Sequence, residues 1–524
     1  MVKESAKKGF VQGALVLMLF GLLSKIVGAI YRIPLTSIIS AEGMGLYQMV
    51  FPLYTLLLTI SSSGIPSSIS KLISEEAIKK NYKQVDRILK VSFCLLVGFS
   101  IFCSLIVLIG SGAFASFQGN SDAKICYRAL APAIIFIGLI SGFRGYFQGL
   151  ECMTPSAVSG FIEQIVKLGT GLLLAGLFID RGVKYGVLGA LLGVSISEAI
   201  AFLYLLIRYL FGAKKRKELL LNSEALVKTK RQTAKDILSL SVFVTIGGLI
   251  MPLTMLIDSV AVINILKSIG FSVKGATTLF GLQTGTVGSI VNMPVVLSLS
   301  VATAVLPCIS KLKASGDVCG LKASASKAVF IVIILALPAS VGCLSLAEPI
   351  LKLLYGRGLS IDELTIAKTL LEVASMGIFY LAMVQVTAGI LQGINKFFVP
   401  VISLGVGGAV KIILNLILVK VPSLNILGAE IASVSCYIVA LIINLSVLKK
   451  QNIIKLDYKT FVVLIASFSI YFSKYIFKLL LDFNVNYFLS LMLTVVFVVL
   501  VYFFIIFILY RKSFKHKKMC KQNK

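Results

Sequence analysis

The chain has 524 residues, of which 58% are hydrophobic and 14% are charged, and its mean hydropathy is +0.97. A soluble domain carries about 25% charged residues, so this composition excludes one and predicts an all-α polytopic membrane protein. A net charge of +29 is typical of nucleic-acid binding in a soluble protein. Here the basic residues concentrate in loops between apolar segments, and we expect no nucleic-acid partner.

Apolar windows recur from one end of the chain to the other, and each is long enough for the roughly 20 residues that a helix needs to cross the hydrocarbon. We predict fourteen transmembrane helices on this basis. They cover 10–33, 45–69, 88–111, 129–150, 155–178, 186–207, 237–261, 276–306, 328–347, 369–392, 397–419, 425–448, 460–481 and 486–510.

The distribution of charge predicts how these helices are oriented. Most of the 51 Lys and Arg residues fall in segments on the same side as the amino terminus. The positive-inside rule therefore places both termini in the cytoplasm of a multi-pass cell-membrane protein. The nine cysteines include no CxxC pair, and the single histidine, His516, lies in the basic tail. We expect no catalytic residues, no metal and no cofactor, and hence a transporter rather than an enzyme.

The chain also contains an internal duplication. Two segments, FRGYFQGLECMTPSAVSGFIEQIVK and LQGINKFFVPVISLGVGGAVKIILN, belong to copies 244 residues apart. The matched pairs are Gly145 with Gly389, Gln148 with Gln392, Gly149 with Gly393, Ser159 with Ser403 and Lys167 with Lys411. Residues 69–72 match 309–312 at a distance of 240. Matches in the same order along the chain favour a duplicated unit of roughly 240 residues.

The duplication and the spans together predict two pseudo-symmetric six-helix lobes followed by two further helices. The predicted parts are an N-lobe with helices 1–6 (1–212), a basic cytoplasmic linker (213–235), a C-lobe with helices 7–12 (236–450), helices 13–14 (451–510) and a basic cytoplasmic tail (511–524).

Charged residues inside the predicted spans are the candidate site residues. Lys25 and Arg32 are seven residues apart and share one face of the first helix. An unpaired cation at that depth costs about 3 kcal/mol, so Lys25 is expected to face a polar cavity, whereas Arg32 has the alternative of reaching the outer surface. Arg144 and Gln148 are one helical turn apart on the fourth span.

Further candidates lie on later spans. Glu163 and Lys167 are one turn apart on the fifth span, where they either neutralise each other or serve a ligand. Lys411 and Asn415 have the same spacing on the eleventh span. Asp258 on the seventh span is a candidate, with Glu163, for binding a coupling ion, or else forms a salt bridge. Because Lys411 is the only basic residue placed within a span of the second lobe, we expect a cationic first-lobe wall that suits an anionic head group.

The stretches at 46–75, 143–167 and 391–415 resemble the stage V sporulation protein B branch of the polysaccharide-transport families. That branch belongs to the multidrug/oligosaccharidyl-lipid/polysaccharide (MOP) exporter superfamily, beside the MurJ-type lipid II flippases. The resemblance implies a MATE/MurJ-like arrangement of two lobes around a central cavity. The pattern from Ser24 through Lys25 to Arg32 matches a family stripe in which the first basic residue is frequently Arg. A lysine there keeps the charge but lacks the bidentate geometry of a guanidinium.

The resemblance implies a flippase for an undecaprenyl-pyrophosphate-linked peptidoglycan precursor of the lipid II type. It would carry its anionic lipid-linked sugar from the inner to the outer leaflet by alternating access, for the vegetative wall or the spore cortex. Coupling to the membrane potential or to a monovalent cation, and contacts with membrane lipids and cell-wall synthases, are further expectations. The alternatives are a cation-coupled multidrug or metabolite exporter and a non-transporting scaffold for wall synthesis.

Overall fold

The computed structural model describes residues 2–62, 64–221, 227–454 and 458–522, and in this part of the chain every regular element is helical. The chain divides into two compact units, which we call the first unit (Met1–Gly281) and the second unit (Leu282–Lys524). The predicted all-α fold is confirmed.

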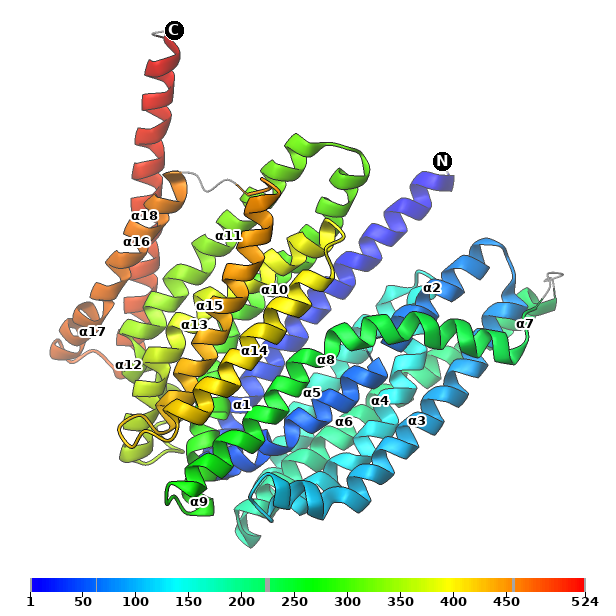
Figure 1. The fold of residues 1–524 in the computed structure, drawn as a ribbon, viewed down its shortest axis with the longest axis horizontal. Coiled ribbons are helices and arrows are strands. Elements are labelled where there is room, and N and C mark those ends of the chain that lie inside the picture. Colours follow the sequence, from blue (N-terminus) through cyan, green and yellow to red (C-terminus); the bar gives the residue numbers. More distant parts are fainter. Residues whose placement is uncertain (1, 63, 222–226, 455–457, 523–524) are drawn as a thin grey trace. The chain divides into compact units, whose positions relative to one another are not determined.

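The first unit is built around α4, which packs against α2, α3 and α6, while α5 packs on α1 and α6. Figure 1 shows α3, α4 and α6 running side by side. The helices of this unit are α1 (Val2–Ser62), α2 (Gly64–Ile78), α3 (Tyr82–Phe117), α4 (Ala123–Gly149), α5 (Met153–Phe178), α6 (Val183–Phe211), α7 (Ala213–Leu221), α8 (Lys230–Ser268) and α9 (Val273–Phe280).

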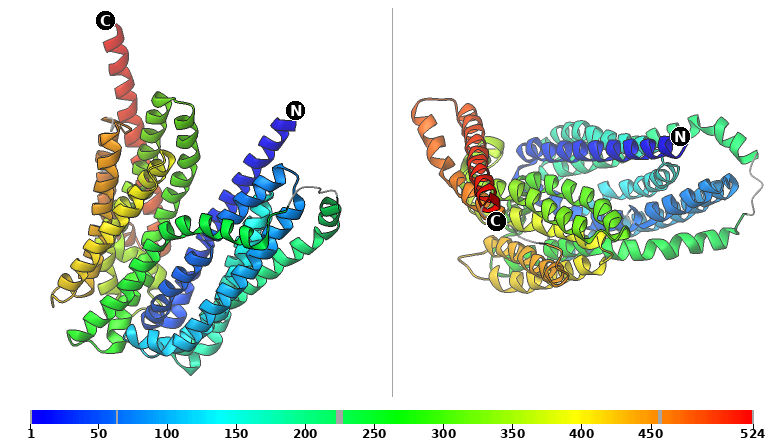
Figure 2. Two further views of the ribbon diagram at one scale, coloured as in Figure 1. Left: turned by 45° about the vertical axis from the view of Figure 1, so that its right-hand side comes forward. Right: turned by 90° about the horizontal axis from the view of Figure 1, so that it is seen from above.

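The second unit is built around α13, which packs against α10, α11 and α15, and α16 and α18 pack together beside α11 (Figure 2). A π-helical stretch (Gly281–Val287) leads into it. Its helices are α10 (Gly288–Ala314), α11 (Val318–Ser345), α12 (Ala347–Tyr355), α13 (Ile361–Gly393), α14 (Phe398–Leu418), α15 (Ile426–Lys450), α16 (Tyr458–Ser469), α17 (Ser473–Asp482) and α18 (Tyr487–Gln522).

Twelve helical segments in the described part of the chain are long and apolar enough to cross a membrane, against fourteen predicted spans. One of the twelve, Leu19–Ile78, covers the first two predicted spans, because α1 continues through a kink at Ser40, whose φ is 63°. The predicted span at 237–261 lies on α8, which includes side chains outside the described set. The structure is therefore compatible with fourteen crossings.

The turn between α4 and α5 recurs between α13 and α14, which confirms the duplication. Glu151 and Asn395 both adopt the left-handed conformation, with φ values of 59° and 64°. The Cys152 N–H donates to the Phe147 carbonyl at 2.9 Å, and in the second unit the Lys396 N–H donates to the Leu391 carbonyl at 2.8 Å. These matched residues are all 244 apart, so both copies of the turn close with the same helix cap.

The packing of the duplicated glycines corrects one detail of the sequence alignment. A Cβ on Gly149 would lie 2.8 Å from Cβ of Ile73, and a Cβ on Gly393 would lie 2.8 Å from Cβ of Ile309. The structural counterpart of Ile309 is therefore Ile73, and the match of residues 69–72 to 309–312 is wrong by one helical turn. An alignment based on identical residues does not detect an insertion or deletion of one helical turn between the two copies.

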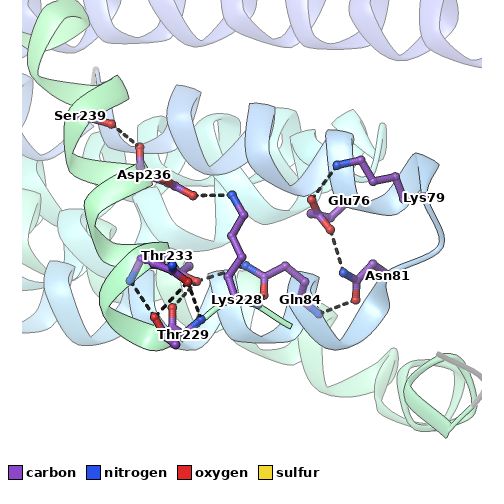
Figure 3. Close-up of polar contacts among 10 residues, drawn as sticks. Glu76, Lys79, Asn81, Gln84, Lys228, Thr229, Thr233, Asp236 and Ser239 are labelled. Carbon is purple, nitrogen blue, oxygen red and sulfur yellow. Dashed lines mark hydrogen bonds and ion pairs between the residues drawn. The ribbon is translucent and has the colours of Figure 1, made fainter. Parts of the chain in front are cut away.

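A polar network fixes the start of α8 to α3 (Figure 3). The side-chain amide of Gln84 donates to Oγ1 of Thr233 at 3.2 Å, and its oxygen accepts the Lys228 N–H at 3.0 Å. The Lys228 ammonium in turn lies 2.7 Å from the Asp236 carboxylate. These bonds group α8 with the first unit, whereas the sequence assigns 236–261 to the second lobe. The lobe boundaries themselves stay a prediction.

Candidate functional site

Close helix packing positions the polar residues of α4 and α5. A Cβ on Gly145 would lie 2.9 Å from the Pro66 carbonyl oxygen, so only glycine allows α4 to approach α2 so closely. On α5, a Cβ on Gly171 would lie 2.7 Å from the hydroxyl of Tyr31. Because these two glycines have no side chain, α4 packs closely on α2 and α5 packs closely on α1. This packing sets which way the faces with Arg144 and Tyr31 are turned.

Arg144 on α4 forms an ion pair with Glu163 on α5. Its Nη2 lies 3.1 Å from Oε2 of Glu163, and its Nε donates to the Ser159 hydroxyl at 3.1 Å. The other carboxylate oxygen of Glu163 accepts a hydrogen bond from the Gln164 amide at 2.9 Å. The two charged side chains are 29% and 19% exposed, so the pair is largely withdrawn from solvent. Glu163 therefore pairs across helices with Arg144.

A second acid, Glu198 on α6, lies close to this pair. Its carboxylate accepts a hydrogen bond from the Tyr54 hydroxyl at 2.9 Å, and its side chain is buried. Glu198 is within electrostatic range of Glu163, Arg144 and Lys167. We call Arg144, Glu163, Lys167 and Glu198 the charge cluster. It draws on α4, α5 and α6, and it holds two cations and two acids.

Lys167 is the member of the charge cluster that contacts α1. Its ammonium lies 5.7 Å from the centre of the Tyr31 ring, within the range of a cation–π interaction. It also lies within electrostatic range of Glu163, Glu198 and Arg32. Lys167 consequently connects the charge cluster to the basic face of the first helix.

That basic face contains Lys25, Gly28 and Arg32, which are three and four residues apart and so lie on one side of α1. A Cβ on Gly28 would lie 3.0 Å from Oε1 of Gln164, so this side of α1 is turned toward α5 near Glu163. Arg32 is half-buried, whereas Lys25 is exposed.

The other predicted site residues lie elsewhere. Gln148 is half-buried at the end of α4. Asp258 is buried on α8 and has a polar or electrostatic partner. Lys411 and Asn415 lie on α14 of the second unit, where both also have partners and Asn415 is fully buried. The structure thus brings together Arg32, Arg144, Glu163 and Lys167 in the first unit, and Lys25 lies two helical turns from Arg32 on the same face of α1.

Sequence reasoning missed the residues that connect these charges. Tyr31, Tyr54, Ser159 and Gln164 carry no charge, and they occur in apolar or small-residue stretches that read equally well as helix packing. Glu198 is visible in the sequence as an acid within a span, but its hydrogen-bonding partner Tyr54 is 144 residues earlier. Helical spacing identifies neighbours within one helix and leaves contacts between helices open.

The duplication does not extend to the charge cluster. Arg144 corresponds to Ala388, Glu163 to Gly407 and Lys167 to Lys411 at the offset of 244. Glu198 corresponds to Tyr437 at the offset of 239 that relates Gly189 to Gly428, so Lys167 alone keeps its charge. The two units therefore share a backbone plan but not this chemistry. The ionic site is a specialisation of the first unit.

A solved structure shares this fold. The structure aligns with that of the "Lipid II flippase MurJ, inward closed conformation" at a TM-score of 0.68 and 16% sequence identity. The alignment covers 95% of this chain and 100% of that chain. At 16% identity this match shows that the two proteins share a fold.

The family follows from a match to the amino-acid sequence. The family model described as "Polysaccharide biosynthesis protein" matches residues 10–313, and a model called MatE matches residues 275–417. Since the first match covers more than half of the chain, the chain belongs to the polysaccharide biosynthesis protein family. This result confirms the resemblance found in the sequence.

Two relatives from Bacillus subtilis (strain 168) match most of the chain. Stage V sporulation protein B is 26% identical over 473 residues, which are 87% of this chain and 86% of the relative. Lipid II flippase MurJ is 28% identical over 455 residues, which are 84% of this chain and 82% of the relative. This chain is accordingly a multi-span membrane protein of a transporter family.

Proposed function

We propose that the chain is a flippase that moves an undecaprenyl-pyrophosphate-linked peptidoglycan precursor from the inner to the outer leaflet of the cell membrane. The observation that carries the proposal is the basic face of α1, where Arg32 lies within electrostatic range of Lys167 in the charge cluster and Lys25 lies two helical turns away on the same face. Family membership and the names of the two relatives support the choice of a lipid-linked sugar as the transported molecule.

The balance of charge favours an anionic head group. Arg144 is offset by its ion-pair partner Glu163, and Lys25, Arg32 and Lys167 add further positive charge to this side of the first unit. Arg144 uses two of its five N–H donors on Ser159 and Glu163, which leaves it donors for a pyrophosphate oxygen. We infer that Lys25 and Arg32 attract the head group, and that Arg144 and Lys167 hold the face on which it binds.

The membrane potential supplies a driving force for this reaction. With both termini in the cytoplasm, an anionic head group moves outward from the negative side, which is favourable by about 2.3 kcal/mol per charge per 100 mV. The empty cationic site is drawn back toward the cytoplasm by the same field. We propose that alternating access in this protein needs no bound nucleotide or cofactor.

A cation-coupled exporter is the second candidate, and the MatE match over residues 275–417 and the buried acids Glu198 and Asp258 favour it. In that case the acids would bind the coupling ion, and neutralising Lys25 would be harmless. The flippase proposal predicts the opposite.

We expect Lys25→Gln to reduce export of the lipid-linked precursor about tenfold, because roughly 1.4 kcal/mol of attraction to an anionic head group is lost. The measurement is wall-precursor export in cells that depend on this protein. Lys474→Gln, on α17 of the second unit, is the matched control and should export normally. Normal export by Lys25→Gln together with loss of export by Asp258→Asn would replace the flippase with the cation-coupled exporter.

A further inference from the structure

The second unit has a cavity lined by lysines at one end of its helices. Its volume is about 220 Å³, and it is bordered by α10, α11, the α13–α14 turn and the end of α15. The lining residues are Lys313, Val318, Leu321, Lys322, Ile394, Lys396, Gln451 and Ile453. This set contains three ammonium groups and no carboxylate. The cavity is separate from the charge cluster, which lies in the first unit.

The duplication places a corresponding cavity in the first unit. That cavity is lined by Tyr82, Val85, Asp86, Leu89, Tyr146, Leu150, Arg216, Leu219 and Leu220. Tyr82, Val85 and Asp86 of this cavity correspond to Val318, Leu321 and Lys322 of the second-unit cavity, each at an offset of 236 residues. Asn81 and Asp317, also 236 apart, cap α3 and α11 by accepting the N–H of the residue three positions later. The two cavities therefore occupy the same place in the duplicated fold.

The first-unit cavity is closed by its own chain. α7 inserts Leu219 and Leu220 and places the Arg216 guanidinium 3.4 Å from the centre of the Tyr209 ring, and only about 60 Å³ remains. The acid of this cavity, Asp86, is 2.6 Å from the ammonium of Lys90. Its charge is thus neutralised within the unit.

The second-unit cavity differs in both respects. Lys322 takes the place of Asp86, and Ser326 takes the place of Lys90, so the ion pair is replaced by a cation. Lys313 donates to the Ile394 carbonyl, which fixes the ammonium at the rim and leaves it two further N–H donors. Three cations that border one open cavity repel one another, and an anion placed among them would relieve that repulsion.

The position of the cavity indicates the source of the anion. Helices α11, α13 and α15, which the structure shows to be long and apolar enough to cross a membrane, begin or end at its edge. Val318, Leu321 and Ile453 give it an apolar wall beside the lysines. A basic pocket between transmembrane helices at the level of the lipid head groups is the kind of site that binds anionic lipids.

We propose that this cavity binds the phosphate of an anionic phospholipid, with Lys313, Lys322 and Lys396 as its ligands. Its volume lies below the roughly 300 to 1,000 Å³ of pockets for drug-sized molecules, which suits a head group better than a whole lipid-linked oligosaccharide. The positive-inside prediction places it on the cytoplasmic face. This site would hold the second unit in register with the inner leaflet, independently of any transported substrate.

The test is titration of the purified full-length protein in neutral detergent with dioctanoyl phosphatidylglycerol, followed by native mass spectrometry. We expect saturable binding of this lipid and little binding of dioctanoyl phosphatidylcholine. Lys322→Asp, which restores the first-unit residue, should weaken the apparent affinity about tenfold or more. Lys420→Asp makes the same charge change on an exposed turn outside the cavity and should bind like the wild type.

Three outcomes would overturn the proposal. They are equal binding by Lys322→Asp and the wild type, equal binding of the zwitterionic lipid, and full competition by inorganic phosphate at the concentration of the lipid. The last outcome would identify a soluble phosphate as the ligand. An unchanged melting temperature without lipid establishes that each variant is folded. No lipid-linked sugar is present in this experiment, so its result does not depend on the proposed flippase activity.

Discussion

Exchanging Arg144 and Glu163 should restore most of the activity that either single substitution removes. The two side chains form an ion pair at 3.1 Å and are 29% and 19% exposed, so removing one partner leaves the other charge largely withdrawn from water. Breaking a fully buried pair costs about 3 to 5 kcal/mol, and for this partly exposed pair we expect about 2 kcal/mol. If this free energy is lost from the transport-competent state, the export rate should fall about thirtyfold.

The experiment compares Arg144→Glu, Glu163→Arg and the double exchange for export rate and melting temperature. Arg144→Glu is expected to be the worst, because it places a third carboxylate beside Glu163 and Glu198. The matched control is the exposed pair Glu348 and Lys368, whose separation is 2.7 Å and whose exchange should change little. Single variants that behave like the wild type, or a double exchange no better than its parts, would show that this pair is not the operative contact.

Gly45→Ala should destabilise the protein more than a methyl group added at Gly28, Gly145, Gly149, Gly171 or Gly393. A Cβ on Gly45 would overlap the carbonyl oxygen of Thr277, where α1 crosses α9, and a backbone atom cannot rotate away as a side chain can. Overpacking of this kind costs about 1 to 3 kcal/mol, and we expect the upper end. The measurement is the midpoint of thermal unfolding in a fixed detergent.

Gly169→Ala on α5 is the matched control. A Cβ at this position meets nothing within 4 Å, and alanine favours a helix over glycine by roughly 0.5 to 1 kcal/mol. The control should therefore melt at the same temperature as the wild type or slightly above it. Equal melting of the two variants would mean that α1 and α9 do not approach as closely as the structure has them.

The parts of the fold that depend on local pattern could be predicted from the sequence. Apolar length gives the spans, and the repeated turn at Glu151 and Asn395 gives the duplication, because both signals are carried by consecutive residues. The kink at Ser40 and the close packing of Gly45 on Thr277 could not be predicted, since each depends on the neighbour that the folded chain supplies.

The candidate site was predictable only in part, for the same reason. Helical spacing groups Lys25 with Arg32 and Glu163 with Lys167, and the structure keeps both groupings on their faces. Spacing cannot choose between Lys167 and Arg144 as the partner of Glu163, because the second lies on another helix. The structure shows that Arg144 is the ion-pair partner of Glu163. Arg144 is therefore expected to hold α5 in place as well as to bind the substrate.

The most direct test of the proposed flippase is translocation of a pyrophosphate-linked polyprenyl sugar in proteoliposomes with an imposed membrane potential. We expect movement of the lipid-linked sugar to the positive side that requires the protein, falls about tenfold in Lys25→Gln and slows when an ionophore collapses the potential. Transport of a cationic dye with no movement of the lipid-linked sugar would contradict it.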